Sequence, residues 1–555
     1  MSLKPHGLEP IPEETRRLMH RLCPKGTLVT QLRDALGPIY SDEHFAHLFP
    51  KRGRPAEAPW RLALVTVLQA LEGLTDRQAA DAVRTRIDWL YALALPLDEP
   101  GFDYSILTDF RQRVLAAGAQ DLLLEPILQL SRERGWLKAR GKQRTDATAV
   151  LARVRALSSL ESVGESMRAA LNALAEQEPT WLKAHLNPAW LERYVHRFEL
   201  ARFPKAETQR TLLREQVGQD VAQLLTDIAE PQTPQAVREL AEVALLRQIF
   251  AQHYEQQGQQ VHWRDGPAVS NEDRIVSPYD QEARSSRKRD LIWLGYKVHL
   301  TETCDQDPTC PQLITHVATT VATLQDSEML APIGEQLRAN ELAPAEHYVD
   351  QGYPSGPQLV RQAQLGTQII GPMGPDPSWQ QREQTGYAVD DFALDWHKQV
   401  ATCPQGQQSV GWTQPRDRRG HPTVVIRFAT ATCRCCPVRA QCTRGQEGRT
   451  LTLTPPDVHA ALVQRRAEQR TPAFVQRYAL RAGVEGTISQ AVRTTRLRRT
   501  PYRGLLKTHL HHVAIAAGLN LKRIAAHVHA QSLGRPSRPV RRTSPFARLQ
   551  DKEAS

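Results

Sequence analysis

The segment Gln143-Arg-Thr-Asp146-Ala-Thr148-Ala-Val150-Leu-Ala152 marks a change in the spacing of apolar residues along the chain. Before it, residues 1 to about 140 carry apolar residues at helical spacing, as in Trp60-Arg-Leu-Ala-Leu-Val-Thr-Val-Leu-Gln-Ala-Leu71. Within it the pattern alternates, which predicts a strand with Asp146, Thr148 and Val150 on one face. Because this strand follows a long helical region, the sequence predicts a fold of mixed α/β class.

Four more strands and a helical interruption are predicted further along the chain. Helical periodicity returns from about residue 155 to 257, so we expect a helical insertion after the first strand. A helix should start at Asp326, with Asp326 or Ser327 as its cap. The further strands are expected at residues 293–301, at 313–321, directly before Asp350, and at 367–372.

These changes in pattern divide the 555 residues into seven segments. At roughly 150 residues per domain, a chain of this length with 41% hydrophobic residues is long enough for three or four domains. We predict a helical N-terminal DNA-binding domain (1–140), the first core strand (141–154), a helical insertion (155–270), the rest of the core (271–372), a Cys-rich insertion (373–455), a last core helix with basic helices (456–530) and a disordered basic tail (531–555).

The N-terminal domain has two features of a DNA-binding module. Short helices joined by tight turns, between Gly73 and Tyr91, indicate either a helix-turn-helix or an ordinary helical bundle. The basic arm Lys51-Arg-Gly-Arg54 has the composition of segments that enter a DNA minor groove. We therefore expect this domain to bind DNA.

A carboxylate in basic surroundings lies near the C-terminus, in Tyr478-Ala-Leu-Arg481-Ala-Gly-Val-Glu485-Gly-Thr487. Spacings of three and seven residues place Tyr478, Arg481 and Glu485 on one face of a predicted helix. Taken alone, such a face is most simply a solvated one that forms salt bridges. Two carboxylates in strand-like settings, Asp146 and Asp350, favour a shared metal site instead, because Mg²⁺ prefers carboxylate oxygens.

The positive charge of the chain is concentrated after Glu485. Between Gly486 and Gln550 there are thirteen Lys or Arg residues and no Asp or Glu, whereas the whole chain has a formal charge of +11. A field of one sign is typical of a protein that binds the phosphates of a nucleic acid. A membrane surface is the alternative partner, but the segment lacks the bulky aromatic face of a membrane-bound helix. We predict DNA contacts by Arg493, Arg496, Arg498, Arg499 and Arg503.

The sequence does not predict a membrane or secreted protein. No apolar run approaches the roughly 20 residues of a membrane span, and the segment Met1-Ser-Leu-Lys-Pro-His-Gly7 lacks the apolar core of a signal peptide. The eight cysteines are not spaced like a disulfide framework. We expect a cytoplasmic, nucleoid-associated protein with reduced thiols.

Four cysteines have the spacing of a structural zinc site. Cys433 and Cys436 can turn both sulfurs toward one ion, and Cys442 and Cys403 can complete a tetrahedral thiolate site. Cys435 is then a spare. We predict a zinc ribbon inserted before the last core helix, with four unconnected thiols as the alternative.

Two basic groups lie beside the predicted core. Lys297 and His299 share one face of a strand and could reach the site, although a strand histidine beside a core is more often structural. We expect the run Arg284–Arg289 to be a loop, either solvated or in contact with DNA. The sequence does not decide between these roles.

The order of these elements resembles that of a known family. The chain is similar to bacterial insertion-sequence DDE transposases, whose RNase H-like core carries one Asp on its first strand, one at the end of its fourth strand, and a Glu on a later helix. The N-terminal helices are similar as well, so the resemblance covers most of the chain. The matching segments are Thr145-Asp146-Ala-Thr148, Ser277-Pro-Tyr-Asp280-Gln-Glu-Ala-Arg284, Gly295-Tyr-Lys-Val-His-Leu300, Tyr348-Val-Asp350-Gln-Gly-Tyr353 and Tyr478-x-x-Arg481-x-x-x-Glu485.

The resemblance implies a metal-dependent enzyme that acts on DNA. Asp146, Asp350 and Glu485 would hold two Mg²⁺, or Mn²⁺ in their place, with Asp146 shared by both ions. An activated water would cut the DNA at the terminal inverted repeats of a transposon, and the freed 3′-hydroxyl would attack target DNA. Tyr478 and Arg481 would hold phosphates of the transposon end. A homodimer acting on two paired ends is also implied.

One position departs from the family pattern. The family carries Lys seven residues after the Glu, where this chain has Val492 followed by Arg493, and Arg493 is the candidate to supply that charge. Two other functions stay open. One is a non-catalytic DNA-binding repressor derived from a transposase, which an intact set of carboxylates argues against. The other is a different RNase H-like nuclease, which would have little use for an N-terminal DNA-reading domain.

Overall fold

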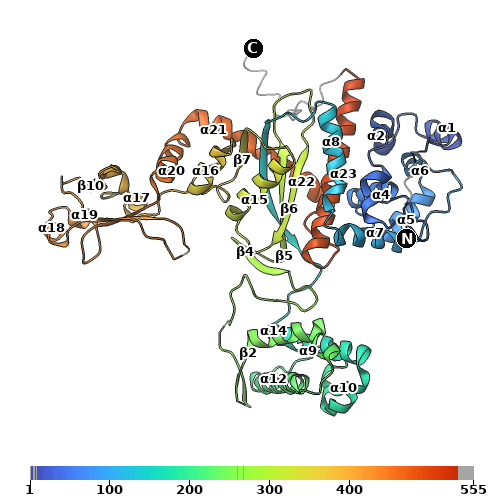
Figure 1. Ribbon diagram of the computed structural model, residues 1–555, viewed down its shortest axis with the longest axis horizontal. Coiled ribbons are helices and arrows are strands. Elements are labelled where there is room, and N and C mark those ends of the chain that lie inside the picture. The colour runs from blue at the N-terminus through green and yellow to red at the C-terminus, as the bar shows by residue number, and fades with distance from the viewer. Residues whose placement is uncertain are drawn as a thin grey trace, which may run out of the picture.

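The computed structural model describes residues 2–3, 7, 9–258, 260–266, 268–418 and 420–534. A central sheet carries helices against it, and two further parts extend away from it (Figure 1). From residue 535 on, the predicted basic tail lies outside the described residues, and its first two residues instead end the last helix. In the described part of the chain, no helix is both long and apolar enough to cross a membrane.

The N-terminal part is a bundle of helices, as the helical spacing predicted. Its longest helix, α4 (Pro59–Glu72), is buried along almost its whole length. Gly73 adopts the left-handed conformation after α4 (φ 69°), and the side chain of Thr75 caps α5 (Asp76–Thr85) by accepting a hydrogen bond from the backbone of Gln78. The remaining helices are α1 (Glu13–Leu22), α2 (Leu28–Leu36), α3 (Asp42–Phe45), α6 (Ile87–Ala92), α7 (Ser105–Ala116) and α8 (Glu125–Glu133), with short 3-10 helices η1 (Ala46–Leu48) and η2 (Gln120–Leu123).

The central sheet is mixed and contains all five strands that the sequence predicted. Its order is β4-β5-β1-β7-β8, and β6 also pairs with β5. The pairs β1–β5 and β5–β6 are antiparallel, whereas β1–β7 and β7–β8 are parallel. The strands are β1 (Lys142–Leu151), β4 (Arg284–Lys288), β5 (Leu291–Thr303), β6 (Ile314–Val321), β7 (Glu346–Val349) and β8 (Gln368–Ile370).

Two details of this region differ from the sequence prediction. The run Arg284–Arg289 is not a loop, because β4 pairs with the first part of β5 across a tight turn in which Arg289 has φ 56°. The residues of β4 are polar and do not alternate with apolar ones. Its strand conformation therefore depends on pairing with β5 rather than on its own sequence pattern. Helix α15 (Asp326–Ala339) starts as expected, but Gln325 is its cap. Helix α16 (Gly356–Gln364) connects β7 to β8.

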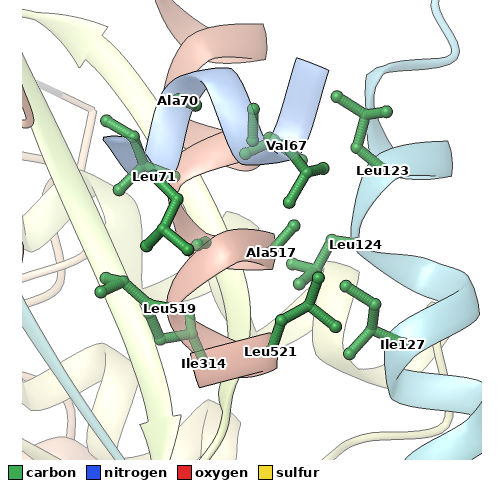
Figure 2. Close-up of a cluster of buried hydrophobic side chains, with 14 of the residues drawn as sticks. Val67, Ala70, Leu71, Leu123, Leu124, Ile127, Ile314, Ala517, Leu519 and Leu521 are labelled. Carbon is green, nitrogen blue, oxygen red and sulfur yellow. The ribbon is translucent and has the colours of Figure 1, made fainter. Parts of the chain in front are cut away.

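Helix α23 (Leu505–Ser532) packs between the N-terminal bundle and the sheet. Leu71 of α4, Leu123 of η2 and Ile314 of β6 all contribute side chains to the buried cluster around it (Figure 2). A Cβ atom on Gly518 would lie 2.9 Å from the Cβ of Leu71, so glycine allows α23 and α4 to approach closely. The amide of Asn520 pairs with both backbone groups of Ile314 at 2.8 Å. The bundle and the sheet therefore share one hydrophobic core.

The two insertions have hydrophobic cores of their own. The first was predicted to be helical and is so except for a hairpin of β2 and β3. Its elements are α9 (Ser159–Gln177), α10 (Pro179–His185), α11 (Pro188–Tyr194), η3 (Leu200–Arg202), α12 (Glu207–Ala229), α13 (Gln235–Arg238), α14 (Ala241–His253), β2 (Tyr254–Gln257) and β3 (Gln260–Trp263). The Cys-rich insertion contains α17 (Trp379–Glu383), η4 (Val389–Asp391), β9 (Ala393–Asp395), β10 (Val400–Thr402), β11 (Gly411–Thr413), β12 (Val424–Arg427), α18 (Thr430–Arg434), α19 (Arg439–Cys442) and β13 (Thr450–Leu453).

The segment from Tyr478 to Glu485 is helical, as predicted, but its middle turn is a 3-10 helix rather than an α-helix. After α20 (Pro456–Glu468), α21 (Pro472–Tyr478) ends and a 3-10 turn, η5 (Ala479–Ala482), leads into α22 (Gly483–Thr494). The interruption lies where the Arg144 guanidinium of β1 donates to the carbonyl of Leu480 at 2.7 Å. A side chain on Gly483 would collide with that guanidinium, so glycine is needed at this contact.

A buried carboxylate, Glu302 of β5, joins four elements. Its side chain has no exposed surface and accepts hydrogen bonds from Arg144 of β1, Thr487 of α22 and Arg523 of α23, at 2.6 to 2.8 Å. Burial alone would raise its pKa, but Arg523 and Arg144 hold the pKa below its ordinary value. Both oxygens are satisfied, so the ionised carboxylate fixes α22 and α23 on the sheet.

We predict that Glu302→Ala destabilises the fold by about 3–5 kcal/mol, because it leaves two arginines buried without their counter-charge. The matched control is Glu335→Ala, whose exposed ion pair with Arg361 (2.8 Å) should be worth less than about 1 kcal/mol. Thermal and urea unfolding of the two variants measure the difference. Equal losses in both variants would contradict this role for Glu302.

Candidate active site

The two predicted catalytic aspartates lie side by side on parallel strands. Thr145 of β1 pairs with Val349 of β7, which places the next residues, Asp146 and Asp350, opposite each other on the same face of the sheet. Asp146 is largely buried, and its Oδ1 accepts a hydrogen bond from the backbone of Ala147 at 2.8 Å. The Oδ1 of Asp350 accepts one from the backbone of Gly352 at 2.9 Å. Both carboxylates are therefore held by local backbone contacts.

Arg481 links the third predicted carboxylate to this pair. Its guanidinium donates to Oδ2 of Asp146 at 2.7 Å and also to Oε1 of Glu485. The Glu485 side chain is 61% exposed, whereas that of Arg481 is only 15% exposed. One cationic group thus lies between the carboxylates of β1 and α22.

The electrostatics of the site favour a cation. Burial raises the pKa of Asp146, the charge of Arg481 lowers it, and the nearby charge of Asp350 raises it further, so that the pKa stays above its ordinary value. Lys288 of β4 also lowers the pKa of Asp146, by less than Arg481 does. Ionised Asp146 and Asp350 need a positive partner, and in this structure Arg481 supplies it.

A fourth carboxylate, Asp326, lies beside these residues and was expected only as a helix cap. It starts α15 and accepts a hydrogen bond from Nζ of Lys297 at 3.0 Å. A Cβ atom on Gly352 would lie 3.2 Å from Oδ1 of Asp350 and 3.5 Å from Oδ2 of Asp326, so the two carboxylates are neighbours. The sequence pattern at the start of α15 did not indicate that Asp326 would lie at the site. The pairing of β5 and β7 with β1 brings these segments together.

Lys297 and His299, which were predicted to share one face of a strand, have different roles. Lys297 turns to Asp326 at the site, as described above. His299 is fully buried, and its Nδ1 is hydrogen bonded to the hydroxyl of Tyr353 at 2.7 Å. Burial lowers the pKa of His299 to about 4, so it is neutral at physiological pH. His299 therefore supports the turn after Asp350 and is not a phosphate-binding cation.

Tyr478 also faces the carboxylates. Its half-buried ring stacks on Phe474 with 5.8 Å between ring centroids. Burial raises the pKa of Tyr478, Arg481 lowers it, and the charges of Asp350 and Asp146 raise it. The interrupted helix thus still presents Tyr478, Arg481 and Glu485 toward the two aspartates.

The five arginines predicted to contact DNA are exposed but do not form one cluster. Arg498 donates to the hydroxyl of Thr148 on β1 at 2.8 Å, and Arg499 pairs by its backbone with Leu151 at the end of that strand. The guanidinium of Arg503 lies 5.5 Å from the ring centre of Tyr279. Arg496 lines a cavity next to the N-terminal helices. Val492, at the family's Lys position, packs against the hydrophobic core, whereas Arg493 is exposed.

The four predicted zinc ligands line one small cavity. Cys403, Cys433, Cys436 and Cys442 surround a space of about 40 Å³, and the exposed Cys435 does not take part in its lining. Burial raises the pKa of Cys442, Arg449 lowers it, and the other three thiols raise it, which places all four near one another. Within the described residues, however, no group of three or more His, Cys, Asp or Glu side chains is arranged so that it could hold a metal ion.

Comparison with known proteins identifies both ends of the chain. Residues 17–113 match the family described as "Transposase domain (DUF772)", and residues 402–525 match the family described as "Transposase DDE domain". The second match contains Tyr478, Arg481 and Glu485. Searches of curated proteins and of solved structures found no match. The two transposase matches agree with the order of elements on the chain and support its resemblance to the insertion-sequence DDE transposases.

Proposed function

We propose that the protein catalyses metal-dependent cleavage of DNA at transposon ends and joins the cut ends to target DNA. The observation that carries this proposal is the convergence of Asp146, Asp350 and Glu485 around the guanidinium of Arg481. Carboxylates from two parallel strands and a helix meet on one face of the sheet. Phosphoryl transfer by two divalent cations requires such a set of oxygen ligands.

The topology supports an RNase H-like core as the framework of this site. Five of the strands follow the order β6-β5-β1-β7-β8, with β1 central, its antiparallel neighbours on one side and its parallel neighbours on the other. The first carboxylate is on β1, the second directly follows β7, and the third is on α22, which packs on β1. The family resemblance implied the same placement of the three carboxylates on the core.

Asp146, Asp350 and Glu485 are not arranged as a metal site while Arg481 lies between them, but their carboxylate oxygens are the ligands that Mg²⁺ or Mn²⁺ would take once Arg481 releases them. Asp146 lies between Asp350 on the neighbouring strand and Glu485 across the Arg481 guanidinium, so it is the ligand that both ions would share. When bound, the two ions would activate the attacking oxygen and stabilise the leaving oxygen. The exposed position of Glu485 leaves its carboxylate free to turn inward once Arg481 releases it.

Arg481 is the residue that must move when the substrate arrives. Its guanidinium holds the carboxylates together in the absence of another cation, and its Nε is buried without a hydrogen-bond partner among the described residues. A phosphate of bound DNA offers it a bidentate acceptor. Arg481, with Tyr478 beside it, would then orient the transposon end while the carboxylates hold the ions. The Lys297–Asp326 pair supplies a further cation at the same site.

We propose that DNA contacts the active site, the arginines that follow α22 and the N-terminal helical domain. The arginines between Arg493 and Arg503 lie on the segment that leads from α22 across the end of β1 to α23, so DNA in the active site would reach them. The N-terminal helical domain would bind the terminal repeats. Because the bundle and the sheet share a core, recognition of the repeat and cleavage would take place on one rigid unit.

We further propose one structural Zn²⁺ in the Cys-rich insertion. Thiolates of Cys403, Cys433, Cys436 and Cys442 are the ligands, and their common cavity supports this assignment. The hydrophobic core of this part contains only seven buried residues. Metal binding would add the stability that so small a core cannot supply.

Charge-removing substitutions test the catalytic carboxylates. Asp146→Asn, Asp350→Asn and Glu485→Gln should each lower Mg²⁺-dependent cleavage of a DNA fragment with the terminal repeats by about a thousandfold, because a neutral amide replaces a charged metal ligand. Binding of the same fragment should persist. Glu335→Gln removes an exposed, remote carboxylate and is the matched control. Near-normal cleavage by any of the three variants would remove that residue from the site.

Elemental analysis tests the zinc site. Purified protein should contain about one Zn²⁺ per chain, and Cys436→Ser should lose it together with about 10 kcal/mol of binding free energy that stabilises the insertion. Cys435→Ser changes the adjacent, exposed thiol and should keep the metal and the melting temperature. Zinc-free protein of normal stability would mean that the four thiols are unconnected.

The mass of the protein–DNA complex tests the proposed assembly. Strand transfer of two ends in one event requires two active sites, so we expect a homodimer that forms or tightens on end DNA. Light scattering should give two chains and two ends per complex. A stable complex of one chain and one end with full strand-transfer activity would rule out the dimer.

A further inference from the structure

A cavity of about 440 Å³ lies between the N-terminal helices and the segment that follows α22. Helices α4, α5 and α7 form one wall, and residues 496–514, including the start of α23, form the other. In Figure 1 these helices lie beside the lower end of α23. Leu151, where β1 ends near this cavity, is five residues from Asp146, roughly 16 Å along an extended strand. The cavity is therefore separate from the catalytic carboxylates.

The floor of the cavity is apolar and aromatic. Leu74, Leu115 and Leu510 line it together with the half-buried ring of Tyr502. The Arg111 guanidinium lies 5.6 Å from the centre of the Tyr502 ring, and the His511 ring meets it edge to face at 5.5 Å. Tyr502 is thus held by its neighbours and can offer a surface to a flat ring.

His511 lines the cavity beside Tyr502. The residue is 9% exposed, and its Nε2 is buried with no hydrogen-bond partner among the described residues, so this nitrogen does not reach the cavity surface. Burial lowers the pKa of His511 to about 4, so the imidazole is neutral at physiological pH and adds an uncharged ring to the wall.

The mouth of the cavity is cationic. Arg153, Arg496 and Lys507 line it with exposed side chains, and Asp76 is the one carboxylate in the lining that the described residues form. The oxygens of Asp76 already accept hydrogen bonds from Arg111, Gln69 and Thr108. The three cations at the mouth are therefore not neutralised by the cavity itself and favour an anion.

We propose that this cavity binds a nucleotide. The base would lie on Tyr502 beside the neutral ring of His511, and the phosphate would contact Arg153, Arg496 and Lys507. The volume is within the range of about 300–1,000 Å³ that small-molecule sites occupy, and an apolar floor with few polar groups is their usual lining. The nucleotide is either free in solution or part of bound DNA, and only the second source rests on the proposed function.

Calorimetric titration of the full chain in EDTA tests the first source. Deoxyadenosine monophosphate should bind, and adenosine or inorganic phosphate alone should bind at least about tenfold more weakly, because each lacks half of the contacts. Tyr502→Leu should weaken binding by about tenfold through the loss of stacking, whereas Tyr502→Phe should retain it. The double variant Arg496→Gln, Lys507→Gln should also lose about tenfold.

A duplex with one unpaired 2-aminopurine tests the second source. Its fluorescence should be quenched by the wild-type chain and by Tyr502→Phe, and not by Tyr502→Leu. Binding in this arm alone assigns the site to a nucleotide of DNA. Both arms measure binding rather than cleavage, so a failure of the catalytic proposal does not affect this one.

Arg361→Gln is the matched control for charge, because Arg361 of α16 is exposed and does not line the cavity. It should leave both measurements unchanged. The proposal is overturned if neither probe responds to Tyr502→Leu, or if Arg361→Gln weakens binding as much as the double variant does, since the effect would then be one of overall charge.

Discussion

The position of the active site depends on the buried carboxylate of Glu302. Removing a carboxylate and two guanidinium groups from water costs several kcal/mol for each ion, and only complete hydrogen bonding offsets that cost. Arg144, Arg523 and Thr487 provide it, and each comes from a different element. Arg144 additionally holds the carbonyl of Leu480, the residue before Arg481. A single ionic network thus sets the distance between β1, which carries Asp146, and the helix that carries Glu485.

The shared hydrophobic core extends this constraint to the N-terminal helices. α23 is buried on both sides, against α4 through the small contact at Gly518 and against β6 through Asn520. It is also the element that receives the Arg523–Glu302 bond. The helical bundle, the sheet and the catalytic helix are therefore fixed to one another, whereas the two insertions have separate cores. The cavity around Tyr502 lies within the fixed part, so its shape is set by packing.

Sequence patterns predicted the elements that have a local signature. Strand patterns predicted β1 and four further strands of the sheet, and helical spacing predicted the N-terminal bundle, because each pattern reports burial of one face. β4 was missed, since Arg284–Lys288 has no buried face and gains its conformation only from β5. The 3-10 turn before α22 was missed for a similar reason, since Arg144 contacts it from more than three hundred residues away. Asp326 at the site, and the cavity beside Tyr502, also arise from contacts between distant segments.

Charge pairing separates structural from functional groups in this fold. Glu302, Asp76 and Asp326 each have a cationic partner within the chain, and these pairs hold elements together. At the candidate active site, the guanidinium of Arg481 pairs with two carboxylates, and Asp350 lies beside them. The site therefore has fewer positive than negative charges. At the mouth of the cavity, cationic side chains outnumber carboxylates, so the lining has an excess of positive charge. A folded chain tends to pair its buried charges. An excess of one charge in a cavity or in a cluster of carboxylates therefore indicates a ligand of the opposite charge. The proposed divalent cations at the first position and the proposed phosphate at the second would satisfy both imbalances.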